Sequence, residues 1–372
     1  MGIVLSVVVP IHNCESELNK CLDSIFKQNF ALPFEVICIL DSSNSKTYEI
    51  VKEYKNNYPR SLRIFETSFR DPGLVRNFGI DKAEGEYIYF IDGDDYLEKN
   101  CFKKLYSIAV KSNADVVIGN FYIVRPPQKR KSSQFFRKLL KDGEYSSEII
   151  AKKIINDFNI RGFVRNKLYK KSLLDKYNIR FVPTKYSIED RPFLLQSVLA
   201  ANKVYLTREK TYNYVQHKES FVKATNVISF IQKSLNCDFL LKIILLRFNL
   251  FDEDVFRKLL SMHFKGISNS FNKLKMKDEK HKKSEIKKEI KRQKLVIAGS
   301  DIYVYGAPWE KATLALNFDT SFYKKLPPSF NIKDLKKIQW ERYIGSFNKL
   351  SFWVVQRQQQ FLLQIYFVMT LI

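Results

Sequence analysis

The chain has 372 residues, with 63 Lys or Arg against 39 Asp or Glu, so its formal net charge at pH 7 is +24. A hydrophobic content of 45% and an aromatic content of 14% exclude a mainly disordered chain, and 12 Gly and 11 Pro exclude collagen-like and proline-rich architectures. The length predicts two domains, or one large α/β domain with an appendage. The charge predicts an acidic partner: a nucleic acid, a phosphorylated substrate or an anionic membrane face.

The N-terminal third alternates between apolar runs and segments with apolar residues at helical spacing. Continuous β-branched runs predict strands buried on both faces. In chain order the predicted strands are Leu5–Pro10, Phe34–Leu40, Leu62–Phe65, Glu86–Ile91 and Asp115–Tyr122, and the predicted helices are Ser16–Gln28, Tyr48–Tyr58, Gly73–Ala83 and Cys101–Ser112. This order predicts a βαβ series, and therefore an α/β fold with a mostly parallel sheet between helices.

The pattern is less regular after this series. Arg125–Gly143 is basic and interrupted by Pro, which predicts a mobile loop, and two helices and a strand are predicted at Ser147–Ile155, Arg191–Ala201 and Lys203–Leu206. Helical spacing dominates beyond about Phe230, in Ile231–Phe248 and Asp254–Met276, before the basic stretch Lys277–Lys294, a strand at Leu295–Tyr305 and the apolar end Phe361–Ile372. We therefore predict an α/β domain at residues 1–228 and a mainly helical C-terminal module at residues 229–372.

The five Cys residues are scattered and include no C-x-x-C pair, so the sequence predicts neither a disulfide framework nor a zinc knuckle. The first residues lack a basic region, and their apolar run is too short for a signal peptide. The sequence contains no run of about 20 apolar residues, so it predicts no membrane-spanning helix. These features predict a reducing, cytoplasmic environment.

Three carboxylates follow the predicted strand Glu86–Ile91, in the order Asp92-Gly93-Asp94-Asp95. Ligands of open α/β sheets bind beyond the carboxyl ends of the strands. Neighbouring carboxylates repel one another unless a cation neutralises them, and hard ions such as Mg²⁺ or Mn²⁺ prefer such oxygen ligands. The alternative is an acidic turn that merely ends a strand, since Asp and Gly are ordinary turn residues.

Five motifs occur in order along the chain. They are Val7–Asn13 (VVVPIHN), Ile39–Ser43 (ILDSS), Arg76–Ile80 (RNFGI), Ala83–Ile88 (AEGEYI) and Ile91–Tyr96 (IDGDDY). This series resembles the family 2 glycosyltransferases of the GT-A fold, over about Leu5–Tyr214. The resemblance implies a GT-A nucleotide-diphospho-sugar transferase fold.

The resemblance also implies roles for single residues. The nucleotide-sugar-binding residues would be Pro10, His12, Asp41, Arg76, Asp92 and Gly93, with Asp41 accepting from a uracil ring and Arg76 beside the base and diphosphate. Asp94 and Asp92 would hold Mn²⁺ or Mg²⁺, Asp94 most directly. Two positions depart from the family pattern: His12 replaces an aromatic residue, and the second motif carries Leu40, Ser42 and Ser45 where the family has Asp, Gly and Asp. The second departure leaves the base and the sugar donor open.

A second carboxylate pair, Glu189-Asp190, precedes Pro192 at the start of a predicted helix. Asp190 as the helix N-cap, with Pro192 in the first turn, is one interpretation. In the resembled family, a Glu-Asp pair at this place supplies the catalytic base, which implies Asp190 as base and Glu189 as the group that orients acceptor or base. A hydroxyl nucleophile needs such a base, and the leaving diphosphate needs the metal and Arg76. One base with in-line attack implies inversion.

Other readings of the sequence are weaker. A sugar nucleotidyltransferase needs a Gly-rich loop after the first strand, and Ile11–Lys20 contains no Gly. Lys129–Lys141 and Lys277–Lys294 are basic, but no nucleic-acid-reading module is present, so a solvated helix or attraction to an anionic inner leaflet is favoured. Phe361–Ile372 is too short to span a membrane, and is an interfacial anchor, a buried element or an oligomer contact.

The sequence therefore predicts an inverting, metal-dependent hexosyl- or N-acetylhexosaminyltransferase that uses a UDP-sugar. Its predicted acceptor is a hydroxyl of a bacterial surface glycan (capsule, exopolysaccharide or teichoic acid), either lipid-linked or polyanionic. The predicted location is the cytoplasm or the inner face of the cell membrane, with the C-terminal module binding acceptor, membrane or another copy of the chain. The alternative is a non-catalytic binding or scaffold protein on a decayed transferase fold, which the altered second motif favours and the intact Asp92, Asp94 and Asp190 disfavour.

Overall fold

The structure is a computed structural model. It describes residues 2–125, 141–156, 163–184 and 188–216, together with Lys233, Cys237, Leu241, Ile244, Leu245 and Phe248. The basic segment at 126–140 and the predicted elements Asp254–Met276, Lys277–Lys294, Leu295–Tyr305 and Phe361–Ile372 lie outside the described residues. The C-terminal module and its division from the α/β domain at residue 228 therefore stay predictions.

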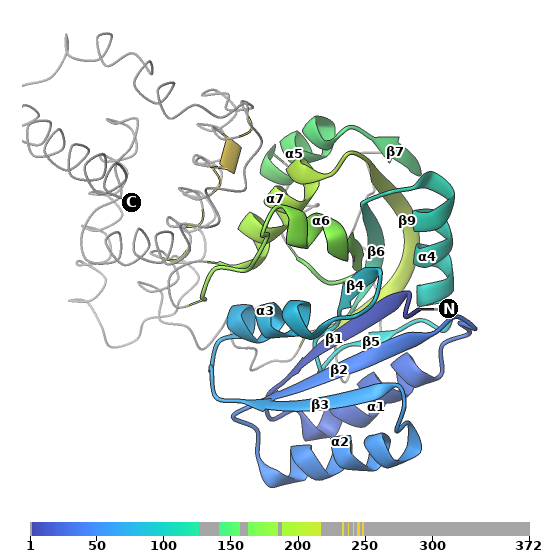
Figure 1. The fold of residues 1–372 in the computed structure, drawn as a ribbon, viewed down its shortest axis with the longest axis vertical. Coiled ribbons are helices and arrows are strands. Elements are labelled where there is room, and N and C mark those ends of the chain that lie inside the picture. The colour runs from blue at the N-terminus through green and yellow to red at the C-terminus, as the bar shows by residue number, and fades with distance from the viewer. Residues whose placement is uncertain are drawn as a thin grey trace, which may run out of the picture. The chain divides into compact units, whose positions relative to one another are not determined.

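A nine-stranded sheet forms the centre of the described region (Figure 1). Its strands are β1 (Leu5–Ile11), β2 (Phe34–Asp41), β3 (Leu62–Thr67), β4 (Tyr87–Phe90), β5 (Tyr96–Leu97), β6 (Val116–Val124), β7 (Gly143–Tyr145), β8 (Lys167–Lys170) and β9 (Val204–Val215). The spatial order is β3-β2-β1-β4-β8-β6-β9-β5, with β7 paired to β9. The first four strands in this order are mutually parallel, as predicted from the βαβ series, and β8 runs antiparallel to both of its neighbours.

The register of the parallel strands brings their carboxyl ends together. Leu5 of β1 is opposite Phe34 of β2 and Tyr87 of β4, so the three strands begin at one level and end at the same edge of the sheet. The loops that follow them carry the sequence motifs. The sheet therefore collects at one edge residues that lie far apart in the chain.

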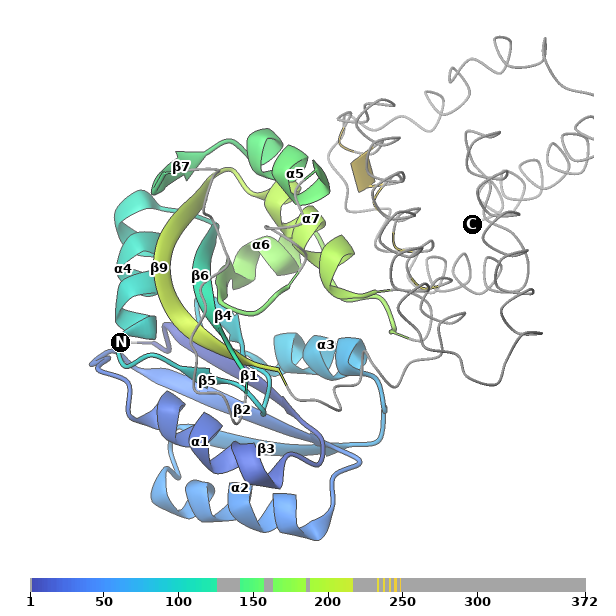
Figure 2. The ribbon, with the colours of Figure 1, turned by 180° about the vertical axis from the view of Figure 1, so that it is seen from behind.

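Seven helices are described: α1 (Glu15–Phe26), α2 (Ser45–Asn57), α3 (Pro72–Lys82), α4 (Cys101–Ser112), α5 (Ser147–Asn156), α6 (Lys171–Lys176) and α7 (Asp190–Ala200). They form two layers (Figures 1 and 2): α1, α2 and α4 share one buried cluster, while α3, α5, α6 and α7 share the other. Alternate residues of β1 supply both clusters, with Val7 and Val9 on the α1 side and Val8 on the α3 side. Among the described residues, no helix is both long enough and apolar enough to cross a bilayer.

Four short elements, β5, β7, β8 and α6, were not predicted from the sequence. The strand predicted at Lys203–Leu206 is longer than expected, because β9 continues to Val215. The remaining predicted strands and helices of the described region are confirmed, with bounds that differ by a few residues.

Side chains just after residue 228 belong to the core of the α/β domain. Cys237, Leu241, Ile244 and Leu245 are at most 4% exposed and join the buried cluster of α3, α5 and α7. All four are helical, and their spacing is that of one helix face, which agrees with the helix predicted at Ile231–Phe248.

Two motif glycines lie where β1 leaves no room for a side chain. A Cβ on Gly85 would lie 2.6 Å from the backbone nitrogen of Ser6, and one on Gly79 would lie 2.3 Å from Val8 Cγ1. We expect Gly85→Ala to lower the free energy of unfolding by about 2–3 kcal/mol, because the backbone of β1 must move. A denaturant titration measures this.

The matched control is Gly143→Ala, whose Cβ would meet only Tyr145 Cε2, at 3.9 Å. This control is expected to change stability by less than about 0.5 kcal/mol. Equal stability of the two variants would contradict the close approach of Gly85 to β1.

Candidate active site

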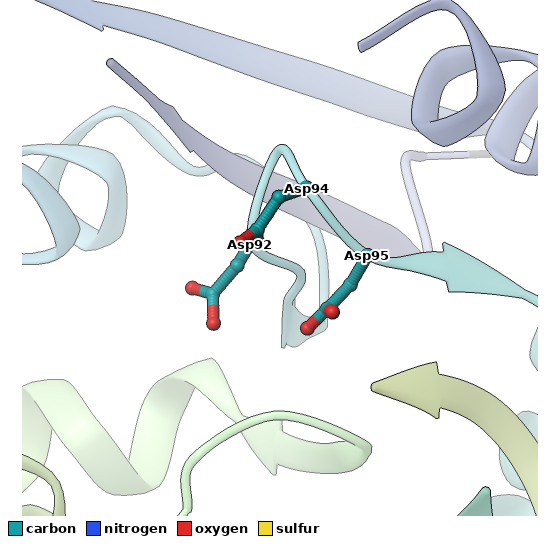
Figure 3. Close-up of side chains that lie close together, drawn as sticks. All are labelled: Asp92, Asp94 and Asp95. Atoms are coloured by element: carbon teal, nitrogen blue, oxygen red, sulfur yellow. The ribbon is translucent and has the colours of Figure 1, made fainter. Parts of the chain in front are cut away.

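The acidic loop, defined as Asp92–Asp95, joins β4 to β5 at the carboxyl edge of the sheet. Oxygen atoms of Asp92, Asp94 and Asp95 lie within 4.8 Å of one another, and Figure 3 shows their side chains leaving one tight turn. The turn is closed by the Asp95 amide, which donates to the Asp92 carbonyl at 3.0 Å. A Cβ on Gly93 would lie 3.4 Å from the Pro10 carbonyl oxygen and 2.9 Å from Cys14 Sγ. The loop is therefore pressed against the end of β1, which explains its Gly.

Arg76 of α3 joins the acidic loop to the second carboxylate pair. Its Nη2 donates to Asp92 Oδ1 at 2.8 Å and its Nη1 to Glu189 Oε1 at 3.1 Å, and Asp190 Oδ1 lies 3.7 Å from Nη1. The Arg76 side chain is 8% exposed. Burial opposes its charge, but the carboxylates of Asp92, Asp190 and Glu189 outweigh burial and raise the pKa of Arg76 above its usual value. One buried guanidinium thus unites three carboxylates from two segments of the chain.

The N-terminus of α3 is anchored so that Arg76 points into this site. Asp71 caps the helix by accepting from the amides of Gly73 and Leu74, at 2.9 and 3.2 Å. The other Asp71 oxygen accepts from the amide and hydroxyl of Thr184, at 2.7 and 2.8 Å. The cap therefore ties the start of α3 to the segment that precedes α7.

Glu189 and Asp190 begin α7. Glu189 stands at the N-cap position with helical φ and ψ and no capping hydrogen bond, and Asp190 is the first helical residue. The interpretation of Asp190 as the cap of this helix is therefore wrong. Burial, with the neighbouring Glu189 charge, raises the pKa of Asp190 to about 7, although Arg76 pulls it down. Asp190 Oδ1 is buried and makes no hydrogen bond with the described part of the chain. A proton acceptor poised near neutral pH is what general-base chemistry requires.

Arg165 is a second cation of the site, and its role was not predicted. Its Nη1 lies 3.0 Å from Asp92 Oδ2 and 3.1 Å from Asp95 Oδ2. Asp95 also accepts from the Tyr212 hydroxyl at 2.5 Å and the Val215 amide at 2.7 Å. Burial raises the pKa of Asp95 to about 8, whereas Arg76 and Arg165 outweigh burial at Asp92 and lower its pKa. Arg165 and Tyr212 stand in the segments Arg165–Tyr169 and Tyr212–Tyr214, which flank Glu189-Asp190 in the chain and resemble motifs of the same family, and this resemblance is the signal that could have identified them.

The predicted nucleotide residues at the ends of β1 and β2 also lie close together. His12 Nδ1 donates to the carbonyl oxygen of Asp41 at 2.7 Å. The Asp41 carboxylate is 6% exposed and accepts from the Thr67 hydroxyl at 3.1 Å and the Asp71 amide at 3.3 Å. Asp41 therefore holds the loop before α3, and contact of Asp41 or His12 with a base stays a prediction.

The acidic loop has the donor atoms of a magnesium or manganese site. Within the described residues it is the one group of three or more such side chains close enough to share an ion. The Asp95 side chain is fully buried, whereas Asp92 and Asp94 are partly exposed, so Asp94 and Asp92 are more accessible to a metal than Asp95 is.

The segment that carries most of this site is similar in sequence to known proteins. Residues 6–177 match the model of glycosyl transferase family 2. Poly(ribitol-phosphate) β-glucosyltransferase of Bacillus spizizenii is 28% identical over 217 residues, which are 58% of this chain and 32% of that protein. Poly(ribitol-phosphate) β-N-acetylglucosaminyltransferase TarS of Staphylococcus aureus is 30% identical over 215 residues, 58% and 36% of the two chains. The chain thus spans about a third of the length of these curated relatives.

A solved structure shows the same architecture. The crystal structure of S. aureus TarS 1–349 in complex with UDP aligns with a TM-score of 0.58 and 25% identity, covering 74% of this chain and 76% of that one. This confirms the GT-A fold predicted from the motif series. The segment that matches the model of glycosyl transferase family 2, residues 6–177, contains β1 to β4, Arg76 and the acidic loop.

Proposed function

We propose that the protein is an inverting glycosyltransferase that moves a sugar from a UDP-sugar to a hydroxyl of a bacterial surface glycan. The observation that carries the proposal is the bridge made by Arg76 between Asp92, on the donor side, and Glu189 and Asp190, on the acceptor side. The bridge brings a candidate metal-binding loop and a candidate base to one place, which a displacement at the anomeric carbon requires.

Two buried polar atoms of this site make no hydrogen bond to any residue that the structure describes. They are Arg76 Nε and Asp190 Oδ1. Such atoms are costly to bury unless a ligand supplies the missing partner. In the proposed reaction, Arg76 stabilises the leaving diphosphate and Asp190 takes the proton of the attacking hydroxyl, while Glu189 holds Arg76 in place.

A divalent ion held by Asp94 and Asp92 would supply Lewis-acid stabilisation of the diphosphate. Asp95, which is 1% exposed, instead fixes the shape of the loop through Tyr212 and Val215. The uridine part of the donor is supported by the UDP complex of the similar TarS structure. His12, Asp41 and Pro10 lie at the same sheet edge and are our candidates for nucleotide contacts.

The proposed acceptor is a polyanionic surface polymer of the poly(polyol-phosphate) class. Both curated relatives quoted above are named for poly(ribitol-phosphate), and the chain carries a net charge of +24. A polymer with one phosphate per repeat would be attracted by this charge, and the attraction would weaken with salt. The proposed location is the cytoplasmic side of the cell, at the membrane where such polymers are built.

The test is a panel of UDP-sugars with Mn²⁺, Mg²⁺ or a chelator, with and without poly(ribitol phosphate), read out as UDP released. We expect one UDP-sugar to be hydrolysed slowly with metal and consumed faster when the polymer is added. If no UDP-sugar is turned over or shifts the melting temperature, the protein is a binding or scaffold protein on the same fold.

The pH profile should report the ionisation of Asp190. The base acts in its deprotonated form, so kcat/KM should fall about tenfold per pH unit below about pH 7. Glu189→Gln removes the like charge that raises the pKa of Asp190, and the acidic limb of the profile should then move to lower pH. An acidic limb at the same pH in both proteins would exclude Asp190 as the titrating base.

A further inference from the structure

Arg165 lies against two aromatic side chains, Tyr214 of β9 and Phe163 of its own segment. Its guanidinium carbon lies 4.0 Å from the ring centre of Tyr214 and 4.6 Å from that of Phe163. Its side chain is 12% exposed, and a single nitrogen, Nη1, contacts both Asp92 and Asp95. Contact with the faces of aromatic rings restricts the plane of a guanidinium and so the direction of its N–H groups.

The two arginines occupy both oxygens of Asp92. Arg76 bonds Oδ1 at 2.8 Å and Arg165 bonds Oδ2 at 3.0 Å. Asp95 is likewise bonded at both oxygens, by Arg165 and Tyr212 at Oδ2 and by the Val215 amide at Oδ1. Two of the three carboxylates in the loop therefore accept hydrogen bonds from protein groups at both oxygens before any metal arrives.

We propose that Arg165 is a positioning residue, a fixed internal cation that restrains the affinity of the acidic loop for a divalent ion in the absence of nucleotide. The inference rests on the proposed function, in which Asp94 and Asp92 hold the metal. Arg165 keeps Asp92 turned toward protein donors and repels a cation at the loop. The ion then binds tightly only when the donor diphosphate adds its own oxygens, so metal and nucleotide enter together.

The charge of Arg165, rather than its bulk, is the operative property in this proposal. Removing one positive charge within a few ångströms of a divalent ion strengthens the binding of that ion, and about tenfold is a conservative expectation for a partly buried site. Arg165→Gln removes the charge, whereas Arg165→Lys retains it. Mn²⁺ affinity of the nucleotide-free protein should rise about tenfold in the first variant and stay within about twofold of the wild type in the second.

A matched control is available at the opposite edge of the sheet. Arg63 Nη1 also contacts two carboxylates, Glu35 at 2.7 Å and Glu84 at 2.8 Å, near the amino ends of the parallel strands. Arg63→Gln should leave Mn²⁺ affinity unchanged. Titration of the full chain with Mn²⁺, followed by electron paramagnetic resonance of free Mn²⁺ or by calorimetry, measures all four proteins. Unchanged affinity in Arg165→Gln, or an equal rise in Arg165→Lys, would overturn the proposal.

If Arg165→Gln fails to fold, Mn²⁺ binding by the wild-type protein, with and without UDP, tests the proposal instead. Its nucleotide-free form should bind Mn²⁺ weakly, with Kd on the order of 1 mM, and UDP should tighten this at least about tenfold. Micromolar Mn²⁺ binding without nucleotide would overturn the proposal. These readouts are independent of turnover: a protein that binds Mn²⁺ as described but consumes no UDP-sugar would refute the proposed function alone.

Discussion

Replacing Asp190 by Asn is expected to reduce sugar transfer by about a thousandfold and, at the same time, to raise the stability of the protein. The rate falls because Asn cannot take the proton of the acceptor hydroxyl. Stability rises because burial and the Glu189 charge raise the pKa of Asp190 to about 7, so the fold disfavours the ionised carboxylate. The folded state binds this proton more tightly than the unfolded state does, and ionisation therefore costs stability as pH rises from about 4 to about 7.

The two effects have different pH dependence, which allows a strict test. Melting temperatures of Asp190→Asn and the wild type should coincide near pH 4, diverge in favour of the variant as the pH rises to about 7, and differ by a constant amount above that. Asp175→Asn is a matched control, because Asp175 of α6 also pairs with an Arg but is 41% exposed and lies outside the site. It should keep full activity. A destabilised Asp190→Asn that still transfers sugar would contradict both the role and the environment assigned to Asp190.

The βαβ part of the fold is predictable from sequence because its signals are local. Strands such as Leu5–Ile11 are continuous apolar runs, and each following helix shows its own periodicity. β8 was not predicted because it is only four residues long and begins with a charged residue, Lys167, which interrupts the apolar pattern. In the structure Lys167 is nevertheless only 5% exposed. Burial lowers the pKa of Lys167 to about 7, and its ammonium group donates to the carbonyl oxygens of Phe163 and Arg165. The fold tolerates a buried Lys only because those carbonyl oxygens accept its hydrogen bonds. Their position depends on the folded structure and is not visible in the local sequence.

The site was predictable as a set of residues but not as a set of contacts. Motif order identified Arg76, the acidic loop and the Glu189-Asp190 pair. The ion pair of Arg76 with Glu189 spans 113 residues, and that of Arg165 with Asp92 spans 73. Arg165 lies beside Asp92 because β8, which follows Arg165, pairs antiparallel with β4, which precedes Asp92, and no local pattern specifies this pairing. The sequence therefore led to Arg76 as a ligand of the donor and did not show that it also binds the candidate base.

Arg76→Gln is expected to have the largest effect on stability, a loss of about 3–5 kcal/mol, together with the loss of transfer. The change leaves Asp92, Glu189 and Asp190 without their shared counter-charge, and breaking a buried ion pair from one side is far more costly than replacing both partners. Arg180→Gln is the control. Arg180 also joins two carboxylates, Asp81 and Asp175, but its side chain is 24% exposed, and its loss should cost about 1 kcal/mol or less. Urea denaturation of each variant gives the two values.

Adding Glu189→Gln to Arg76→Gln separates the structural role of Arg76 from its chemical role. The second change removes one of the stranded charges, so the double variant should recover part of the lost stability. It should not recover transfer, because neither amide stabilises a departing diphosphate. Recovery of both would mean that Arg76 only holds Glu189 and Asp190 in place. Recovery of neither would mean that Arg76 stabilises the fold mainly through Asp92, and the bridge between the donor and acceptor sides would then not be the feature that holds the site together.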